Sequence, residues 1–257
     1  MAPLAFITGA SSGIGQALAA RFLAAGHCVA LVARREAALR DWVQATGADA
    51  SRVAVYGADV RDVDAITAAG RACIAVHGLP DVVVANAGIS VGVDTADAQD
   101  LEVMRATLET NLLGMAATFQ PFVGPMRERR SGRLVGIASV AGIRGLPGHG
   151  AYCASKAGVI GYCESLRGEC RASGVKVVTL VPGYVDTPLT RRNRYPMPFL
   201  MSAERFADLA YRRIVAGSRY GVIPWPMAVV AKALRALPDA AFDALLAGRP
   251  RKPRRGE

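Results

Sequence analysis

Short apolar runs alternate with longer amphipathic segments through the first two thirds of the chain, and this alternation most restricts the fold. Six apolar runs predict buried strands, at Leu4–Ile7, Cys28–Ala33, Val53–Gly57, Val82–Ala85, Leu134–Ile137 and Val175–Val181. Three- and four-residue apolar spacing predicts helices at Gly15–Ala25, Arg35–Thr46, Val63–Val76, Leu101–Arg130 and Ala151–Arg171. Uniformly apolar strands that alternate with helices are typical of a parallel sheet covered on both faces. The sequence therefore predicts an α/β fold, a single doubly wound Rossmann-type domain with a C-terminal helical extension.

The last third of the chain departs from this alternation after Pro182-Gly183. Three segments are expected next, a loop at Arg191–Phe199, a helix at Ser202–Ala216 and a strand at Tyr220–Ile223. Prolines then interrupt the chain before an amphipathic stretch at residues 227–246, which Pro238 divides into two short helices. We therefore expect a Rossmann-type domain at residues 1–223, and a helical extension with a basic tail at residues 224–257.

The formal net charge of +10 raises the question of nucleic-acid binding. Residues 249–257 hold five basic side chains and one acidic one, so a large part of the excess lies in this tail. The remaining charge is spread along the chain, and a nucleic-acid role would rest on the tail alone. We therefore expect no nucleic-acid partner.

The five cysteines give no sign of a disulfide framework or a metal site. They are odd in number, with no C-x-x-C pair and no histidine cluster beside them. Reduced thiols and no bound metal are the expectation. The first apolar stretch ends at Thr8-Gly9, too soon for a signal peptide or a membrane span, so we expect a cytoplasmic protein.

Three glycines fall within the segment Thr8-Gly-Ala-Ser-Ser-Gly-Ile-Gly15, directly after the first expected strand. In a doubly wound sheet this turn is where phosphate-bearing ligands bind, because glycine lets backbone N–H groups approach a pyrophosphate. The spacing, Gly9-x-x-x-Gly13-x-Gly15, is neither G-x-G-x-x-G nor a P-loop. By itself it fits either a cofactor site or tight packing of the helix on the strand.

Further motifs follow the glycine loop at intervals that match the expected strands and helices. They are Asp59-Val60, Asn86-Ala87-Gly88, Asn111, Ser139, Tyr152-x-x-x-Lys156 and Pro182-Gly183-Tyr-Val-Asp-Thr187. Over residues 4–223 this set resembles the short-chain dehydrogenase/reductase family. The resemblance implies an oxidoreductase that uses a nicotinamide cofactor to interconvert a ketone or aldehyde and an alcohol.

Four residues are expected to carry the chemistry, Asn111, Ser139, Tyr152 and Lys156. An unperturbed tyrosine loses its proton near pH 10, so one that acts near neutrality needs a positive neighbour. Lys156 follows Tyr152 at i+4 and so projects from the same face of a helix. The resemblance assigns proton transfer to Tyr152 and a hydrogen bond to the substrate oxygen to Ser139. It assigns the nicotinamide ribose to Lys156 and a bound water to Asn111.

The expected cofactor is NADP(H) rather than NAD(H). NAD-preferring enzymes usually offer a carboxylate after the second strand, whereas this strand ends in Arg34-Arg35 and the first acid is Glu36. Arg34 is the candidate for the 2′-phosphate, although both arginines could also be solvated residues at a helix start. The expected cofactor-binding residues are Gly9, Ser11, Ser12, Gly13, Ile14, Gly15, Arg34, Asp59, Val60, Asn86, Ala87, Gly88, Tyr152, Lys156, Pro182, Gly183, Val185 and Thr187.

The substrate is expected to be a small, hydrophobic carbonyl or alcohol compound, held by loop 142–150 and the Arg191–Phe199 segment. The second segment is rich in arginine and is accompanied by Tyr195, Met197, Phe199 and Met201. It fits an apolar lid with a basic rim, which would suit a substrate with an acidic tail, or alternatively a mobile surface loop. A rival interpretation is a non-catalytic dinucleotide sensor on the same fold. Intact Ser139, Tyr152 and Lys156 favour the enzyme, since a sensor has no need of all three.

Three arrangements remain open for the amphipathic stretch at 227–246. It could pack on its own domain or a neighbouring subunit, lie on an anionic membrane surface beside the basic tail, or be loosely ordered. Asp239 and Asp243 on its polar face count against strong membrane binding. The family resemblance also implies a homo-oligomer, a dimer or a tetramer, with contacts through the helices at 101–130 and 151–171.

Overall fold

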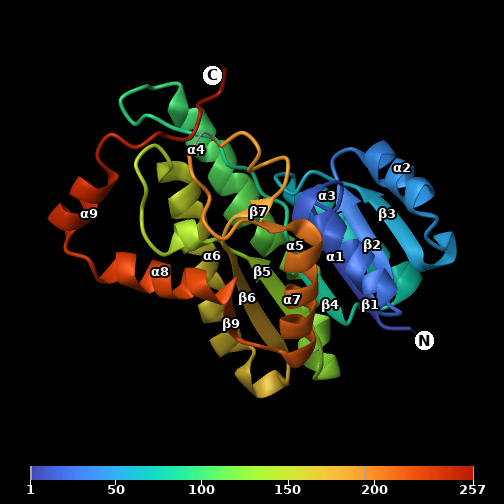
Figure 1. The fold of residues 1–257 in the computed structure, drawn as a ribbon. Helices are drawn as coiled ribbons and strands as arrows, with labels where there is room; N and C mark the ends of the chain where they lie inside the picture. The colour runs from blue at the N-terminus through green and yellow to red at the C-terminus, as the bar shows by residue number, and fades with distance from the viewer. Residues whose placement is uncertain (1, 194, 257) are drawn as a thin grey trace.

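The computed structural model describes residues 2–193 and 195–256, and its centre is a sheet in which all described strands run parallel (Figure 1). The strands are β1 (Leu4–Thr8), β2 (Cys28–Ala33), β3 (Val53–Gly57), β4 (Val82–Ala85), β5 (Arg133–Ile137), β6 (Lys176–Pro182) and β9 (Tyr220–Ile223). Their order across the sheet is β3-β2-β1-β4-β5-β6-β9. The strand order reverses between β1 and β4, which is where ligands bind in open sheets of this kind.

Helices cover both faces of this sheet, which confirms the predicted doubly wound α/β fold (Figure 1). The helices are α1 (Gly13–Ala24), α2 (Glu36–Thr46), α3 (Val63–His77), α4 (Asp100–Leu108), α5 (Gly114–Arg129), α6 (Gly150–Glu169), α7 (Ala203–Ala216), α8 (Trp225–Ala236) and α9 (Asp239–Leu246). Buried side chains of α1, α2 and α7 share one core layer, and those of α3, α5 and α6 share the other.

Strand β1 shows how one short segment supplies both layers. Its side chains alternate between the faces, so Leu4 and Phe6 belong to the α3–α5–α6 layer while Ala5 and Ile7 belong to the α1–α2–α7 layer. The Phe6 ring is fully buried and lies 4.9 Å from the ring of Phe122, measured between centroids. Burial on both faces explains why the strand is apolar throughout.

The long helix expected at 101–130 is interrupted in the structure. Helix α4 ends at Leu108, a π-helical turn occupies Glu109–Leu113, and α5 continues from Gly114. Gly114 also packs closely against the segment that follows β3, since a Cβ placed there would lie 2.8 Å from Val60 O. No periodicity in the sequence marks such a turn, because its apolar spacing differs from that of an α-helix by a single residue.

The C-terminal extension forms α8 and α9, which are separated at Pro238 as expected. Helix α8 contacts β9 and the turn Val140–Gly142, so the amphipathic stretch packs on its own domain. Its outer side remains open, with Trp225 71% and Val229 60% exposed. None of the helices in the described ranges has the length and apolar character needed to cross a bilayer.

We predict that Phe6→Ala destabilises the protein by about 3–5 kcal/mol, because the cavity left between the strand and Phe122 cannot be filled by a neighbour. Urea unfolding followed by circular dichroism measures the change. Val76→Ala, at a 71% exposed position of α3, is the control and should shift stability by less than about 0.5 kcal/mol. A loss in Phe6→Ala no larger than in the control would contradict the described core.

Candidate active site

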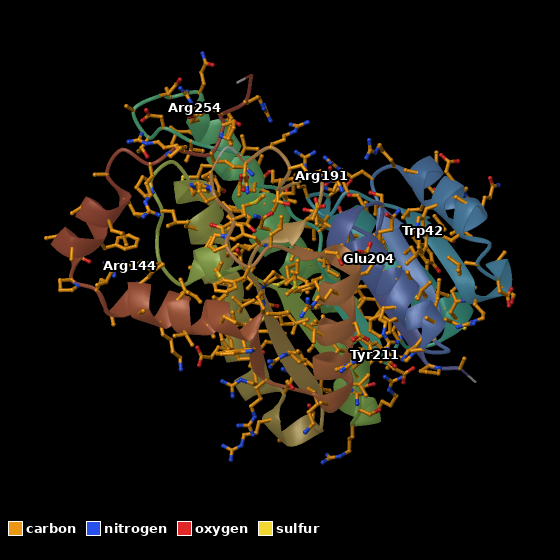
Figure 2. All side chains as sticks on the ribbon, in the orientation of Figure 1. Trp42, Arg144, Arg191, Glu204, Tyr211 and Arg254 are labelled. Atoms are coloured by element: carbon orange, nitrogen blue, oxygen red, sulfur yellow. The ribbon has the colours of Figure 1, made fainter. Side chains whose placement is uncertain are left out.

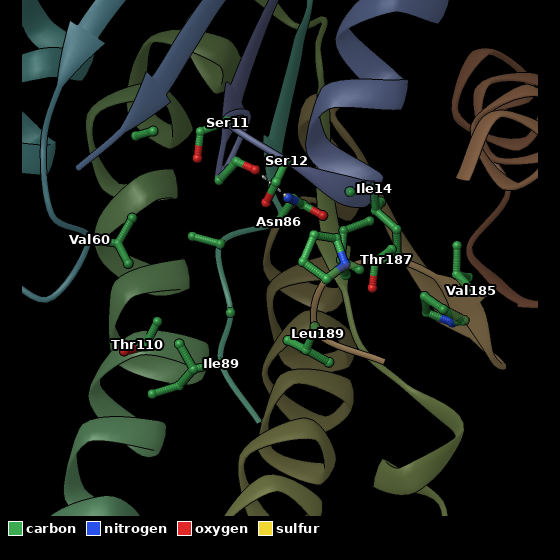
Figure 3. Close-up of a pocket in the computed structure, with 18 of the residues that line it drawn as sticks. Ser11, Ser12, Ile14, Val60, Asn86, Ile89, Thr110, Val185, Thr187 and Leu189 are labelled. Carbon is green, nitrogen blue, oxygen red and sulfur yellow. Dashed lines mark hydrogen bonds between the residues drawn. The ribbon is translucent and has the colours of Figure 1, made fainter. Parts of the chain in front are cut away.

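A cavity of about 270 Å³ lies at the carboxyl edge of the sheet, beyond the ends of β1, β2, β4, β5 and β6 (Figure 3). It brings together most of the residues expected at a cofactor and catalytic site. Those that line it are Gly9, Ser11, Ser12, Gly13, Ile14, Arg34, Asp59, Val60, Asn86, Ala87, Gly88, Ser139, Tyr152, Lys156, Pro182, Gly183, Val185 and Thr187. Gly15 and Asn111 lie behind its walls.

The glycine loop presents the start of α1 to this cavity. Gly9 and Gly13 have φ angles of 66° and 56°, values that side chains other than glycine rarely adopt. Ser12 stands at the N-cap without a side-chain capping bond, and the first turn holds no acidic residue. The N-terminal end of α1 therefore offers backbone N–H groups and a positive dipole end to an anion.

Asn86 holds the carboxyl ends of β1 and β4 together beneath the loop. Its side-chain amide donates to Thr8 O at 3.0 Å and to Gly9 O at 3.3 Å, and the Thr8 hydroxyl accepts from the Asn86 N–H at 3.1 Å. Gly15 packs directly on this junction, because a Cβ there would lie 2.3 Å from Gly9 O. Gly15 thus shapes the loop from behind.

Cations surround the end of the cavity next to β2 and β3. Arg34 and Arg35 are exposed, line the cavity and directly follow β2. Asp59, at the end of β3, is engaged by Arg61 Nη2 at 2.7 Å, and this hydrogen bond together with the charge of Arg34 lowers the pKa of the Asp59 carboxyl. Glu36, the first acidic residue after the arginine pair, is engaged by Arg40. This end of the cavity is suited to a phosphate.

The π turn in the middle of the α4–α5 segment carries Asn111, which is 1% exposed. Its side chain accepts from the Ile89 N–H at 2.8 Å, and donates to Ile89 O and to Ser155 Oγ, each at 2.9 Å. Ser155 in turn donates to Tyr152 O at 2.8 Å. Asn111 therefore ties the segment after β4 to the first turns of α6.

Lys156 is fully enclosed between these elements. Its Nζ donates to Ile137 O at 2.8 Å, and a Cβ on Gly88 would lie only 3.5 Å from it. Burial lowers the pKa of the Lys156 amino group to about 8. The Nζ lies 5.8 Å from the centroid of the Tyr152 ring, at the outer limit of a cation–π contact.

Ser139 and Tyr152 both line the cavity and lie within hydrogen-bond distance of each other. Burial raises the pKa of the Tyr152 phenol above its ordinary value, and the hydrogen bond with Ser139 opposes that shift. Ser139 itself caps the turn after β5 by accepting from the Ala141 N–H at 3.2 Å. In the protein without nucleotide, burial thus outweighs the hydrogen bond with Ser139, and Tyr152 keeps its proton near neutral pH.

A second, larger cavity of about 950 Å³ meets the first at Ser139 and Tyr152. Loop 142–150 and the segment after β7 (Val185–Asp186) line it, with Tyr195 and Met197 among the contributors. His149 Nε2 lies 3.2 Å from the Tyr195 hydroxyl. Most of its other lining residues are apolar.

The Arg191–Phe199 segment differs in part from the apolar lid with a basic rim. Phe199 is 51% exposed, and Met201 is buried in the core through β8 (Met201–Ser202), a strand that pairs with β7 and was not expected. Arg191 is exposed and pairs with Asp186. Arg194 lies outside the described residues.

Several residues at the two cavities were missed from sequence. Thr8 and Ser155 orient Asn86 and Asn111, and only their places within the glycine loop and the Tyr152–Lys156 motif could have pointed to them. The larger omission is the C-terminal extension and tail. Their lining residues include Met227, Leu234, Phe242, Arg249, Arg251 and Lys252. Nothing local in the sequence indicates that this end returns to the cavity.

The chain matches known proteins over most of its length. Residues 3–197 match the family model described as short chain dehydrogenase. An uncharacterized oxidoreductase of Myxococcus xanthus (strain DK1622) is 42% identical over 243 residues, which cover 93% of this chain and 94% of that protein. An acetoacetyl-CoA reductase of Acinetobacter sp. (strain RA3849) is 36% identical over 193 residues, covering 74% of this chain and 77% of that protein.

Among solved structures, one described as ribose-5-phosphate isomerase from Brucella melitensis 16M superimposes with a TM-score of 0.75 at 30% identity. The match covers 86% of this chain and 89% of that chain. Its description names an isomerase, and its likeness to this chain is one of fold. The family model and the first of these relatives align over the part of the chain that carries most of the predicted motifs. The chain belongs to the short-chain dehydrogenase/reductase family of oxidoreductases.

Proposed function

We propose that the protein is an NADP(H)-dependent oxidoreductase that interconverts a hydrophobic ketone or aldehyde and the corresponding alcohol. The observation that carries this proposal is that Ser139 and Tyr152 line both cavities at once. One cavity has the donors and cations of a dinucleotide site, and the other is largely apolar. A substrate carbonyl at their junction would meet a hydroxyl and a phenol.

The residues at the junction have separate roles in this proposal. Tyr152 gives its proton to the carbonyl oxygen during reduction and takes one from the alcohol during oxidation. Ser139 donates a hydrogen bond to the same oxygen. Lys156 keeps a positive charge beside the phenol, and Asn111 positions the segments that hold it.

NADP(H), when bound, supplies or accepts the hydride. The first turn of α1 and the glycine loop would hold its pyrophosphate, and Arg34 its 2′-phosphate. Asp59 and Val60 would lie at the adenine, Asn86 to Gly88 at the adjacent ribose, and Thr187 at the carboxamide. The cavity residues fit such a ligand, because Arg34 and Arg35 are exposed there while Asp59 is engaged by Arg61.

The apolar cavity favours an enzyme over a dinucleotide sensor. A sensor needs only the nucleotide site, whereas here a cavity of about 950 Å³ opens onto Tyr152. The similar acetoacetyl-CoA reductase acts on a carbonyl compound, which supports reduction of a ketone as the reaction.

We predict that Tyr152→Phe lowers kcat by about 10³-fold, because the variant has no proton to transfer. NADPH affinity should stay within about threefold, since the ring is kept. The measurement is NADPH oxidation with a panel of aliphatic and aromatic ketones, together with a fluorescence titration of NADPH. Tyr162→Phe, on the same helix but outside both cavities, is the control. Undiminished turnover in Tyr152→Phe would refute the proposed role.

Arg34→Ala should raise the Kd for NADPH by about 10- to 100-fold and leave the Kd for NADH within about twofold. The reason is that a charge-assisted hydrogen bond to the 2′-phosphate is lost, and NADH has no such group. Isothermal titration calorimetry with both nucleotides measures the difference. Arg71→Ala, at an exposed site on α3, controls for loss of overall positive charge. Equal weakening of both nucleotides by Arg34→Ala would exclude the phosphate contact.

The charge on Lys156 predicts a pH-dependent stability. Its pKa is about 8 in the folded protein and 10.5 in the unfolded chain, so between these values the unfolded chain holds a proton that the folded protein lacks. Stability from this group therefore rises with pH across that window, by about 3 kcal/mol in total. Relative to Lys156→Met, wild type should gain stability between pH 8 and pH 10.5.

Urea unfolding of both proteins without nucleotide, at several pH values from 7 to 10, measures this difference. Groups remote from Lys156 titrate alike in both proteins and cancel in the comparison. A stability difference that does not change with pH, or that changes in the opposite direction, would show that Lys156 is not desolvated as described.

A further inference from the structure

The C-terminal tail is anchored along the wall of the larger cavity. Gly92 N–H donates to Pro253 O at 2.9 Å, and Lys252 Nζ donates to Leu189 O at 3.1 Å and to Asn193 Oδ1 at 2.6 Å. Figure 2 shows Arg254 beside the start of α4, where it pairs with Asp97 of the preceding segment and with Asp100, the first residue of α4. These contacts hold the backbone around Lys252 in a defined place.

The anchored tail brings uncompensated positive charge to an apolar cavity. Four cations line it, and none of the described residues that line it is Asp or Glu. Arg144, labelled in Figure 2, pairs with Asp239 at 2.9 Å and stacks on the ring of Phe242 in α9. Lys252 is 6% exposed and has only uncharged acceptors among the described residues.

Arg249 and Arg251 stand on either side of Pro250 at the mouth of this cavity. Both are exposed, and within residues 2–193 and 195–256 neither has a carboxylate within ion-pair distance. The Arg251 side chain is placed by Gly148, whose added Cβ would lie 3.0 Å from Arg251 Cβ. Cations that line a low-dielectric cleft concentrate the positive potential there.

We propose that Arg249 and Arg251 form an anion subsite for the substrate. The ligand is a carbonyl compound with an apolar body and an anionic group, a carboxylate or a phosphate, at the end remote from the carbonyl. Tyr152 and these arginines line the same cavity, whose volume accommodates a body of this size. This inference rests on the proposed function and names its substrate class.

The basic rim expected around the substrate cavity comes from Arg249 and Arg251 in the tail, and not from the arginine-rich segment after β7. Arg191 and Arg192 line neither cavity, and Arg191 is already paired with Asp186. Arg255, beyond the anchor at Arg254, is exposed and also lines neither cavity. Arg255→Ala is therefore a matched control, because it removes the same charge from the same tail.

The first test is equilibrium binding, which requires no turnover. Decanoate and decanamide, which are equal in length and differ in charge, are titrated into the nucleotide-free protein by calorimetry. Wild type and Arg255→Ala should bind decanoate about tenfold more tightly than decanamide. The double variant Arg249→Ala/Arg251→Ala should bind both with equal affinity. Equal affinity of the two probes in wild type, or an equal loss in Arg255→Ala, would overturn the subsite.

A second test separates the two sources of the anion. Rates with NADPH are compared for 10-oxoundecanoate, its methyl ester and acetoacetyl-CoA. A tenfold loss of kcat/KM in the double variant for the oxo acid, with the ester unchanged, assigns the subsite to a carboxylate of the substrate. A loss of kcat/KM with acetoacetyl-CoA alone assigns the subsite to the phosphates of the coenzyme A carrier. A loss with the methyl ester equal to that with the oxo acid overturns the proposal. Absence of turnover with all three would refute the proposed function while the binding result still decides the subsite.

Discussion

The parallel alignment of the strands is the constraint on which the rest of the molecule depends. Because β1, β2, β4, β5 and β6 all end at one edge, the residues that follow each strand converge although they are far apart in sequence. The hydrogen bonds of Asn86 to Thr8 O and Gly9 O lock the central pair at that edge. The glycine loop, the arginines after β2 and the serine after β5 are positioned from this junction.

Burial of polar groups then shapes the chemistry of the edge. Lys156 is enclosed, and burial lowers the pKa of its amino group to about 8, while its Nζ donates to Ile137 O. The same burial keeps the proton on Tyr152, which suits a group that must donate to a carbonyl oxygen. The Asn111–Ser155 hydrogen bond connects the two sides of this enclosure. A preorganised site of this kind is assembled before any ligand binds.

The order of strands and helices follows from local patterns, and the sequence was a good guide to it. Apolar runs located the strands to within about one residue, and the i+4 spacing correctly placed Lys156 near Tyr152. The spacing could not show that the Lys156 amino group donates to Ile137 O, because that contact depends on the position of β5. The π turn around Asn111 and the small β7–β8 sheet also depend on tertiary contacts, and local periodicity does not encode them. The return of the tail to Gly92 and Asn193 is a contact between distant segments of the same kind.

The proposed function requires that NADP(H) binds at the carboxyl edge of the sheet with its reactive ring at the junction of the two cavities. The decisive measurement is a crystal structure of the protein with NADP⁺. We expect the pyrophosphate at the first turn of α1, the 2′-phosphate bonded to Arg34, and the nicotinamide between Ser139 and Tyr152. A nucleotide bound elsewhere, or a ring turned away from Tyr152, would contradict it.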